Sequence, residues 1–511
     1  MKRYPSRLFA CFLTAMAVFS PLPVFSQSLK EFEKKVTEFT LANGMRFLVI
    51  ERHGAPVVSF NTYVNAGSVD DPNGRTGIAH MMEHMAFKGT PTIGSRNWAS
   101  EKAAMAGIET AYDRLEQERR KGLTASKEKI AALEEALQKA IAKADDYVNP
   151  NEYDKVVERN GGVGLNAGTT EDATNYYYSF PANRLELWFM LESARFRNPV
   201  FREFYKERDV VREERRMRIE SSPQGKLVEA LLAASYTAHP YHIMPGGWAS
   251  DIENFREPEA MKFFREHYVP GNITVGIAGD VDPKQAKIFA EKYFGTIPAG
   301  PLPSPVRTVE PAQEGERRVA VESPAQPILA MAYHVPDGRH ADSAAIEVLS
   351  DVLSGGRTGI LYKELVRDKQ LALGAGSQTD FPGSKYPSLM LFFVVPNAGK
   401  TIEENEKAVY EVVERMKKTP IDAESLARVK TKLRAQLIRK LDNNMGLASE
   451  MTSYSVLEGD WRRLFTSLED IEKVTAADLQ RVAQSYLTQK NRTVAWTVQP
   501  AAGAPADKEA K

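Results

Sequence analysis

The most informative residues, from Gly77 to Thr90, read GIAHMMEHMAFKGT. His80 and His84 are four residues apart, so on a helix both imidazoles point the same way and can bind one metal ion. Glu83 lies on the same face, where it can accept a proton from a metal-bound water without being a ligand. This H-x-x-E-H order reverses the commoner H-E-x-x-H zinc motif. The pentad therefore predicts a metal, a base and a reaction class together.

The residues around the pentad predict that its helix is buried. They are mostly apolar, as in Ile78, Met81, Met82 and Met85. Two His and a Glu can also decorate an exposed helix face. In a buried helix, however, these side chains need partners, and a metal with its water supplies them for all three. The apolar flanks therefore favour a metal site.

A third protein ligand is expected from a second helix, because a zinc bound by two His needs one more ligand and an open position for water. Glu207, Val210, Val211 and Glu214 have the spacing i, i+3, i+4, i+7, which forms one helical stripe. This stripe puts two carboxylates and two valines on the face expected to meet the pentad helix, and Glu213 falls well off it. We therefore predict Glu214 as the third ligand and Glu207 as a support that orients a His or tunes the metal. The alternative is a Glu/Arg-rich helix with a solvated, salt-bridged face.

These residues resemble those of the pitrilysin/insulinase-type (inverzincin) zinc metallopeptidases, specifically the branch that includes the mitochondrial processing peptidase. Residues 83–90 read almost letter for letter like that branch, and residues 64–68 resemble its strand-and-turn entry to the motif helix. Residues 207–214 resemble the distal ligand segment, in which the last Glu binds zinc and the Glu seven before it assists. The resemblance implies one Zn²⁺ per chain.

The same resemblance extends to the expected substrate strand. Residues 165–170 (LNAGTT), followed by Thr174 and two tyrosines, resemble the family's strand that pairs with extended substrate. Asn166 and Ala167 would then bind the peptide backbone by β-addition, which favours extended peptides over folded proteins.

An insertion separates the pentad from the distal ligand by more than the family usually shows. Residues 100–148 are rich in Glu, Lys and Ala and read as two helices with a break near residues 121–124. Ile130, Leu133 and Leu137 give the second helix an apolar stripe. We predict an inserted helical hairpin beside the active-site helix, which gates substrate, contacts a partner or is a solvent-exposed spacer.

The second half departs from the family in another way. Active single-chain or homodimeric members often carry an Arg and a Tyr, seven apart, that hold the substrate carbonyl. Aligned on residues 371–372, these positions hold Val366 and Leu373; aligned on Arg367, the Tyr position holds Gly374. Neither alignment restores the pair. The inference is a heterodimer, in which a homologous partner subunit supplies the Arg/Tyr clamp, or otherwise a homodimer.

Composition describes an ordinary soluble protein with a secretion signal. The chain has 511 residues and zero formal net charge, so nothing argues for nucleic acid or an anionic membrane. Residues 1–26 combine basic residues, a short apolar run and a Pro-rich end, as in a signal peptide, and the run is too short to span a membrane. The only cysteine, Cys11, lies within it. A mature chain without cysteine, and without a membrane span, suits the periplasm.

The mature chain also reads as an internal duplication. Residues 267–277 parallel residues 485–496 as helix, turn and strand, and residues 57–64 parallel residues 327–335. The counterpart of the pentad, residues 345–349, has no ligand set. We predict an α+β protein of two homologous α/β-sandwich modules forming half of a clamshell. The expected segments are a signal peptide (1–26), a metal-binding module (27–297), a Pro-rich linker (298–313), an inactive module (314–500) and a disordered tail (501–511).

The predicted function is zinc-dependent endopeptidase action on peptides or unfolded segments held in extended form in a closed chamber, with Glu83 as general base. One alternative is a non-catalytic structural or assembly subunit of the same fold. Another is a small-molecule zinc lyase, which the length and the expected peptide-binding strand disfavour. His239 and His242 are three apart across a proline, and we interpret them as loop residues and not as a second metal pair.

Overall fold

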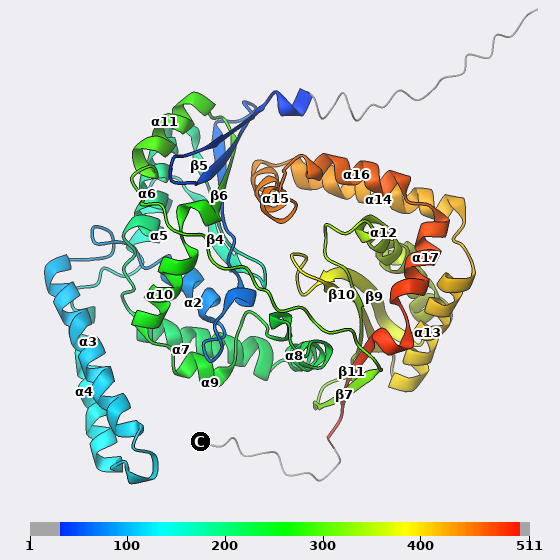
Figure 1. Ribbon diagram of the computed structural model, residues 1–511, viewed down its shortest axis with the longest axis horizontal. Helices are drawn as coiled ribbons and strands as arrows, with labels where there is room; N and C mark the ends of the chain where they lie inside the picture. Colours follow the sequence, from blue (N-terminus) through cyan, green and yellow to red (C-terminus); the bar gives the residue numbers. More distant parts are fainter. Residues whose placement is uncertain (1–30, 501–511) are drawn as a thin grey trace, which may run out of the picture.

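The computed structural model describes residues 31–500 as two mixed sheets that lie side by side, each covered by helices (Figure 1). The first sheet has the strand order β1-β2-β6-β3-β5-β4. Its strands are β1 (Val36–Thr40), β2 (Arg46–Glu51), β3 (Val57–Val64), β4 (Val163–Thr169), β5 (Thr174–Pro181) and β6 (Ile273–Gly279). Only β2 and β6 run parallel to each other, and the other neighbours are antiparallel. Strand β4 is an edge strand, because it pairs with β5 alone.

The second sheet repeats this topology without the outermost strand. Its order is β7-β11-β8-β10-β9, and its single parallel pair, β7 with β11, corresponds to the parallel pair of β2 with β6 in the first sheet. The strands are β7 (Arg317–Glu322), β8 (Leu329–Val335), β9 (Ala372–Phe381), β10 (Ser388–Pro396) and β11 (Arg492–Val498). Strand β7 thus corresponds to β2, β11 to β6, β8 to β3, β10 to β5 and β9 to β4. The predicted α+β architecture of two homologous modules is confirmed.

One pair of asparagines shows how far the repeat extends. Asn272 donates to the carbonyl of His267, five residues earlier, and to the carbonyl of Asn65 after β3. Asn491 makes the same two bonds, to Tyr486 and to His334. In both modules this amide joins the end of a helix to the neighbouring strand, just before the strand that closes the module.

Helices of each module cover one face of its own sheet. In the first module these are α2 (Ile78–Met85), α6 (Leu185–Arg197), α10 (Glu257–His267) and α11 (Pro283–Tyr293), and in the second α12 (Ser343–Ser354), α13 (Ile402–Lys418) and α17 (Ala476–Tyr486). The other helices of the second module include α14 (Ala423–Leu441) and α16 (Arg463–Lys473). The sheet and the helices enclose one core in each module.

The opposite face of each sheet is covered by a helix from the other module. Helix α15 (Asn444–Leu457) packs on β3 and β6 of the first sheet, while α8 (Pro223–Ser235) packs on β7, β8 and β11 of the second (Figure 1). Leu48 and Ile50 of β2 therefore meet Leu447 and Met451. Because both faces of β2 are covered, its central residues are all buried, and its sequence is apolar without alternation. The exchange of helices joins the two modules into one body.

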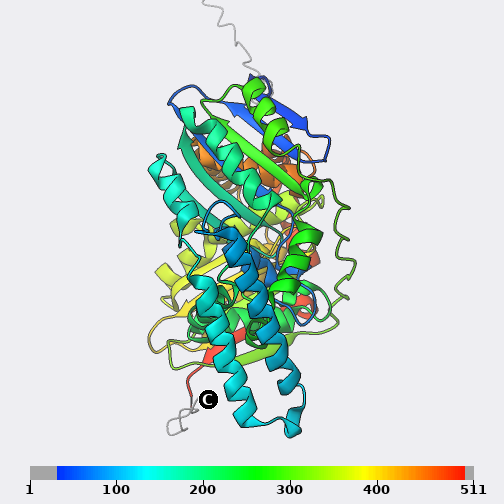
Figure 2. The same cartoon turned by 90° about the vertical axis from the view of Figure 1, so that its left-hand side faces the viewer.

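Two antiparallel helices project from the first module. They are α3 (Trp98–Arg119) and α4 (Lys127–Asp145), joined by a short 3-10 turn at Gly122–Thr124, and Figure 2 shows them in front of the body. Their base is tied to the loop after α2 by the buried Arg202. Its guanidinium pairs with Glu101 at 2.7 Å and donates to the carbonyl oxygens of Thr90 and Ile93, each at 2.8 Å. The hairpin is thus anchored beside the segment that carries the pentad.

No helix within residues 31–500 is long and apolar enough to cross a membrane. The proposed signal peptide (1–26) and the proposed C-terminal tail (501–511) lie outside the described residues. Residues 298–313 contain no helix or strand and connect the two modules along the surface.

Candidate metal centre

The pentad lies on α2, whose start is fixed by two local features. Gly77 begins the helix with φ of 90°, a backbone conformation that favours glycine, and a Cβ there would lie 3.3 Å from the Cα of Gly247. Asp71 accepts the N–H groups of Gly77 at 2.6 Å and Ala79 at 2.9 Å, so it caps the first turn. Burial raises the pKa of this Asp71 carboxyl well above its usual value. These contacts set the direction in which α2 presents its side chains.

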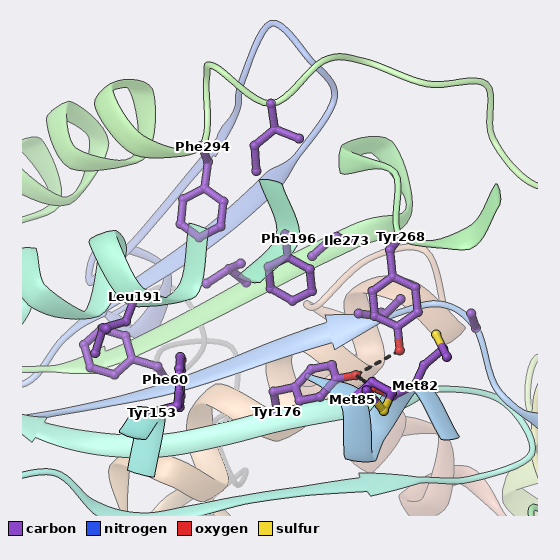
Figure 3. Close-up of a cluster of buried hydrophobic side chains, with 14 of the residues drawn as sticks. Phe60, Met82, Met85, Tyr153, Tyr176, Leu191, Phe196, Tyr268, Ile273 and Phe294 are labelled. Atoms are coloured by element: carbon purple, nitrogen blue, oxygen red, sulfur yellow. Dashed lines mark hydrogen bonds between the residues drawn. The ribbon is translucent and has the colours of Figure 1, made fainter. Parts of the chain in front are cut away.

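One face of α2 packs into the core of the first module, as the sequence predicts. Met82 and Met85 are buried against Tyr176, Phe196 and Tyr268 (Figure 3). The hydroxyls of Tyr176 and Tyr268 are 2.9 Å apart. Packing on this face leaves the two histidines and Glu83 on the other side of the helix.

The structure brings His80, His84 and Glu214 together. Oε2 of Glu214 lies 3.7 Å from Nε2 of His80 and 3.4 Å from Nε2 of His84. One ligand atom from each residue lies within 4.8 Å of the others. In a tetrahedral zinc site with bonds of about 2.0–2.1 Å, ligand atoms are about 3.3 Å apart. The separations to Glu214 are close to this value, so the three donors fit a zinc ion after small side-chain movements.

The protonation of the two histidines fits a cation site as well. Burial and the nearby charge of His84 lower the pKa of His80 to about 4, so this imidazole is neutral and available as a ligand. Burial also opposes charge on His84, but hydrogen bonds to Glu207 and Glu214 outweigh it and raise the pKa to about 9. Nδ1 of His80 is buried without a hydrogen-bond partner among the described residues. His80 is therefore a neutral donor, and the carboxylates of Glu207 and Glu214 attract positive charge to the site.

Glu207 lies where the stripe on α7 (Phe204–Arg215) predicts it. Its Oε2 is 3.3 Å from Nδ1 of His84, on the side of the ring away from Glu214, and its Oε1 is 2.5 Å from Nζ of Lys88. Burial raises the pKa of Glu207, but hydrogen bonds to His84 and Lys88 outweigh it and lower the pKa. A carboxylate at the second ring nitrogen fixes the orientation of a metal-binding histidine.

The stripe is only partly buried, which differs from the expectation for its two valines. Val211 is fully buried, whereas Val210 is 49% exposed. With 100° between successive residues, Val210 lies on the flank of the stripe, beyond the strip that α2 covers. Glu207, Val211 and Glu214 are the members that face the pentad.

Glu83 is held by a hydroxyl from the neighbouring edge strand. Oγ1 of Thr169, the last residue of β4, donates to Oε2 of Glu83 at 2.6 Å. Burial raises the pKa of Glu83, although the hydrogen bond from Thr169 opposes this shift. This contact was not predicted, because Thr169 is 86 residues away along the chain. Among the described residues, Oε1, the other oxygen of Glu83, accepts no side-chain hydrogen bond, so it can bind a water or a substrate group.

A second unpredicted residue lies beside Glu214. After α7 the chain continues as a π-helix, η4 (Arg216–Glu220), and Nη1 of Arg218 lies 2.8 Å from Oε1 of Glu214. The side chain of Arg218 is 77% exposed. Its positive charge contributes to the low pKa values of His80 and Glu214, and it opposes the larger effect of burial, which raises the pKa of Glu83. Its position depends on the π-helix, which the sequence pattern did not indicate.

Asn166 and Ala167 lie on β4, whose free edge is next to α2. In register they oppose Tyr177 and Tyr176 of β5. The N–H of Ala167 donates to the side-chain Oδ1 of Asn166 at 2.9 Å. This main-chain donor is therefore occupied by an exposed side chain of the same strand.

The second module has no comparable cluster. Across residues 31–500, His80, His84 and Glu214 form the one group of three or more His, Cys, Asp or Glu that could hold a metal ion. Residues 345–349 of α12, the counterpart of the pentad, are AIEVL. His239 and His242 lie at a 3-10 turn, where His239 accepts the N–H of Tyr241, and they belong to no such group.

Two family models match most of the chain. Residues 46–119 and 133–244 match the family model for Insulinase (Peptidase family M16), and residues 256–433 match the model for the Peptidase M16 inactive domain. The chain belongs to this insulinase-type peptidase family. The gap between the first two segments contains the turn that joins α3 to α4.

Curated relatives extend along almost the whole chain. The chain is 28% identical over 481 residues to the zinc protease PqqE of Helicobacter pylori, covering 92% of this chain and 94% of that protein. It is 21% identical to the probable mitochondrial-processing peptidase subunit beta of Arabidopsis thaliana, over 92% of this chain and 80% of that protein.

Solved structures share the fold. A protease from Helicobacter pylori superposes with a TM-score of 0.76 at 26% identity, over 91% of this chain and 99% of that one. The first half of the periplasmic protease PqqL from Escherichia coli gives 0.66 at 17% identity, over 91% and 92%. The longer PqqL chain is covered over 48% of its length, with a TM-score of 0.67. The fold described here thus corresponds to one half of that protein.

Proposed function

We propose that the protein is a zinc-dependent endopeptidase in which His80, His84 and Glu214 hold one zinc ion. The observation that carries this proposal is the meeting of these three donors beside Glu83, a fourth polar side chain that is close by but outside the donor set. Three protein ligands with one open position are typical of catalytic zinc, whereas structural zinc has four. The names of the relatives and the family support peptide hydrolysis.

Glu83 is the proposed general base. When bound, zinc polarises a carbonyl and lowers the pKa of a coordinated water toward about 7. Thr169 holds Oε2 of Glu83, so Oε1 is free to take a proton from the attacking water and later deliver it to the leaving amine. Burial raises the pKa of this carboxyl, which makes it a stronger base than an exposed glutamate.

The open edge of β4 is the proposed substrate site. Asn166 is exposed, and the N–H of Ala167 is bound only to the Asn166 side chain in the contacts described above. An extended peptide can displace that side chain and add a strand to the sheet, close to α2. Thr169, two residues further along the same strand, would then place Glu83 next to the bound backbone.

A partner subunit is proposed to complete the site. The chain corresponds to half of the longer PqqL, and the expected Arg/Tyr positions hold Val366 and Leu373 or Gly374. Arg367 pairs with its neighbour Asp368 at 2.6 Å and is exposed. A homologous chain carrying the clamp, or a second copy of this one, would close the other half of the clamshell. We also propose that residues 1–26 act as a signal peptide that directs the protein across the inner membrane to the periplasm.

The decisive experiment compares Glu83→Gln with the natural protein. General-base loss should lower turnover of an internally quenched peptide by about 10²–10⁴-fold. Zinc content, measured by elemental analysis, should stay at one per chain. Glu213→Gln is the matched control, because Glu213 is 50% exposed and pairs with Arg216 away from the trio.

The same variant separates the enzyme from a non-catalytic assembly subunit. Each form is assayed alone and after assembly with the subunit that co-purifies from the native source. An active assembly that loses its activity with Glu83→Gln places catalysis in this chain. An assembly that is equally active with either form would support the non-catalytic alternative, and a chain that binds no zinc would contradict the proposed centre.

A further inference from the structure

The two oxygens of Glu214 are held by different partners. Oε2 faces the ring nitrogens of His80 and His84, while Oε1 lies 2.8 Å from Nη1 of Arg218. A carboxylate can offer a metal one oxygen or both. Here one oxygen points between the imidazoles and the other points to a guanidinium.

We propose that Arg218 is a positioning residue that holds Oε1 of Glu214, so that only Oε2 is presented to the zinc. This inference rests on the proposed zinc site. Arg218 would then support Glu214 in the same way that Glu207 supports His84. The described structure gives the Arg218 guanidinium no ion-pair or hydrogen-bond partner other than Glu214.

The local backbone explains how Arg218 reaches Glu214. The two residues are four apart and follow each other from α7 into the π-helix η4. The backbone at Arg218 and Ile219 is fixed from the other side, because Gly225 of α8 approaches them so closely that a Cβ there would lie 2.3 Å from the Arg218 carbonyl oxygen. Single π-turns occur frequently at functional sites. The tight contact with α8 therefore fixes the backbone position of Arg218.

The charges around the site show what Arg218 can influence. Glu214 is 17% exposed, whereas Arg218 is 77% exposed, so the ion pair joins a sheltered carboxylate to a solvated cation. Such a pair is weak as a source of folding stability. Its effect on metal binding is larger, because mutation of a residue that orients a metal ligand typically lowers metal affinity 10- to 100-fold.

The test compares Arg218→Ala, Arg218→Lys and Arg216→Ala. Arg216 is the matched control: it lies in the same π-helix, is 50% exposed and pairs with Glu213. Zinc affinity is measured by competition with a chromophoric chelator. We expect Arg218→Ala to bind zinc about 10- to 100-fold more weakly. Arg218→Lys should recover most of the affinity, and Arg216→Ala should match the natural protein.

A second readout reports on coordination directly. Cobalt(II) replaces zinc in the same variants, and its visible absorption depends on the number and arrangement of ligands. We expect an altered spectrum for Arg218→Ala and an unaltered one for Arg216→Ala. The melting temperature of the metal-free proteins should be equal, because Arg218 is exposed.

Three results would overturn the inference. Equal zinc affinity and equal cobalt spectra for Arg218→Ala and Arg216→Ala would make Arg218 an ordinary surface residue. Tighter zinc binding by Arg218→Ala would show that repulsion between the guanidinium and the metal dominates. Unchanged metal properties with reduced peptide cleavage would make Arg218 a substrate contact. Absence of zinc binding by the natural protein would instead refute the proposed function itself.

Discussion

Replacing Glu207 with Gln tests how the site orients His84. In the natural protein, Glu207 lies 3.3 Å from Nδ1 of His84 and 2.5 Å from Nζ of Lys88, and its side chain is 17% exposed. Glutamine keeps the size and shape of the side chain but removes its charge. Lys88 retains an ion pair with Glu203 at 3.3 Å, so the substitution leaves no cation without a partner.

The expected magnitude follows from the bond to His84. A hydrogen bond to a charged group contributes about 1.5–3 kcal/mol. Each 1.4 kcal/mol corresponds to about a tenfold change in affinity. We therefore expect zinc affinity to fall by about 10- to 100-fold, which agrees with the usual effect of removing a carboxylate behind a metal-binding histidine.

The assay is competition for zinc against a chromophoric chelator at fixed pH, with Glu213→Gln as the control. Glu213 belongs to the same helix but lies off the stripe, and its carboxylate pairs with Arg216. The control should bind zinc like the natural protein. An affinity for Glu207→Gln equal to that of Glu213→Gln would refute the assigned support of His84.

Three other outcomes are expected. Thr169→Val, which removes the hydroxyl that holds Glu83, should lower kcat about 10-fold or more with zinc retained, and Thr169→Ser should restore it; equal kcat in all three forms would contradict the role. Ala167→Pro, which removes the N–H offered at the β4 edge, should raise KM for extended peptides with little change in melting temperature, and an unaltered KM would argue against strand addition. Gly276→Ala should destabilise folding by about 1–3 kcal/mol, because its Cβ would lie 2.5 Å from the Ala448 carbonyl oxygen on α15; an unchanged denaturation midpoint would contradict the close packing of that helix.

The local features of the site could be predicted because they depend on spacing within one segment. The pentad and its apolar flanks specify a buried helix with both histidines on one face, and the structure has α2 in that form. The stripe on α7 likewise placed Glu207 and Glu214 toward the pentad. Similar successions of helix, turn and strand in the two halves of the sequence indicated the duplication, which the strand orders of the two sheets confirm.

Contacts that depend on strand neighbours or on irregular helix geometry could not be predicted in the same way. Thr169 meets Glu83 because β4 lies next to α2, and Arg218 meets Glu214 because α7 continues as a π-helix. Val210 satisfied the helical spacing but lies outside the strip that α2 covers. Periodicity states which face a residue occupies, whereas the width of the buried strip depends on the neighbouring helix.

The exchanged helices explain why the module that carries the proposed metal site depends on the second module. Leu48, Ile50 and Ala278 of the first sheet are buried by Leu447, Ala448 and Met451, which belong to α15 of the second module. Without that module, the back of β2 and β6 would be exposed to water. Those strands support β3 and β5, and β5 in turn carries β4 with Thr169. The position of the proposed base therefore depends on packing supplied by the second module, even though none of the described residues of that module belongs to the proposed metal-binding trio.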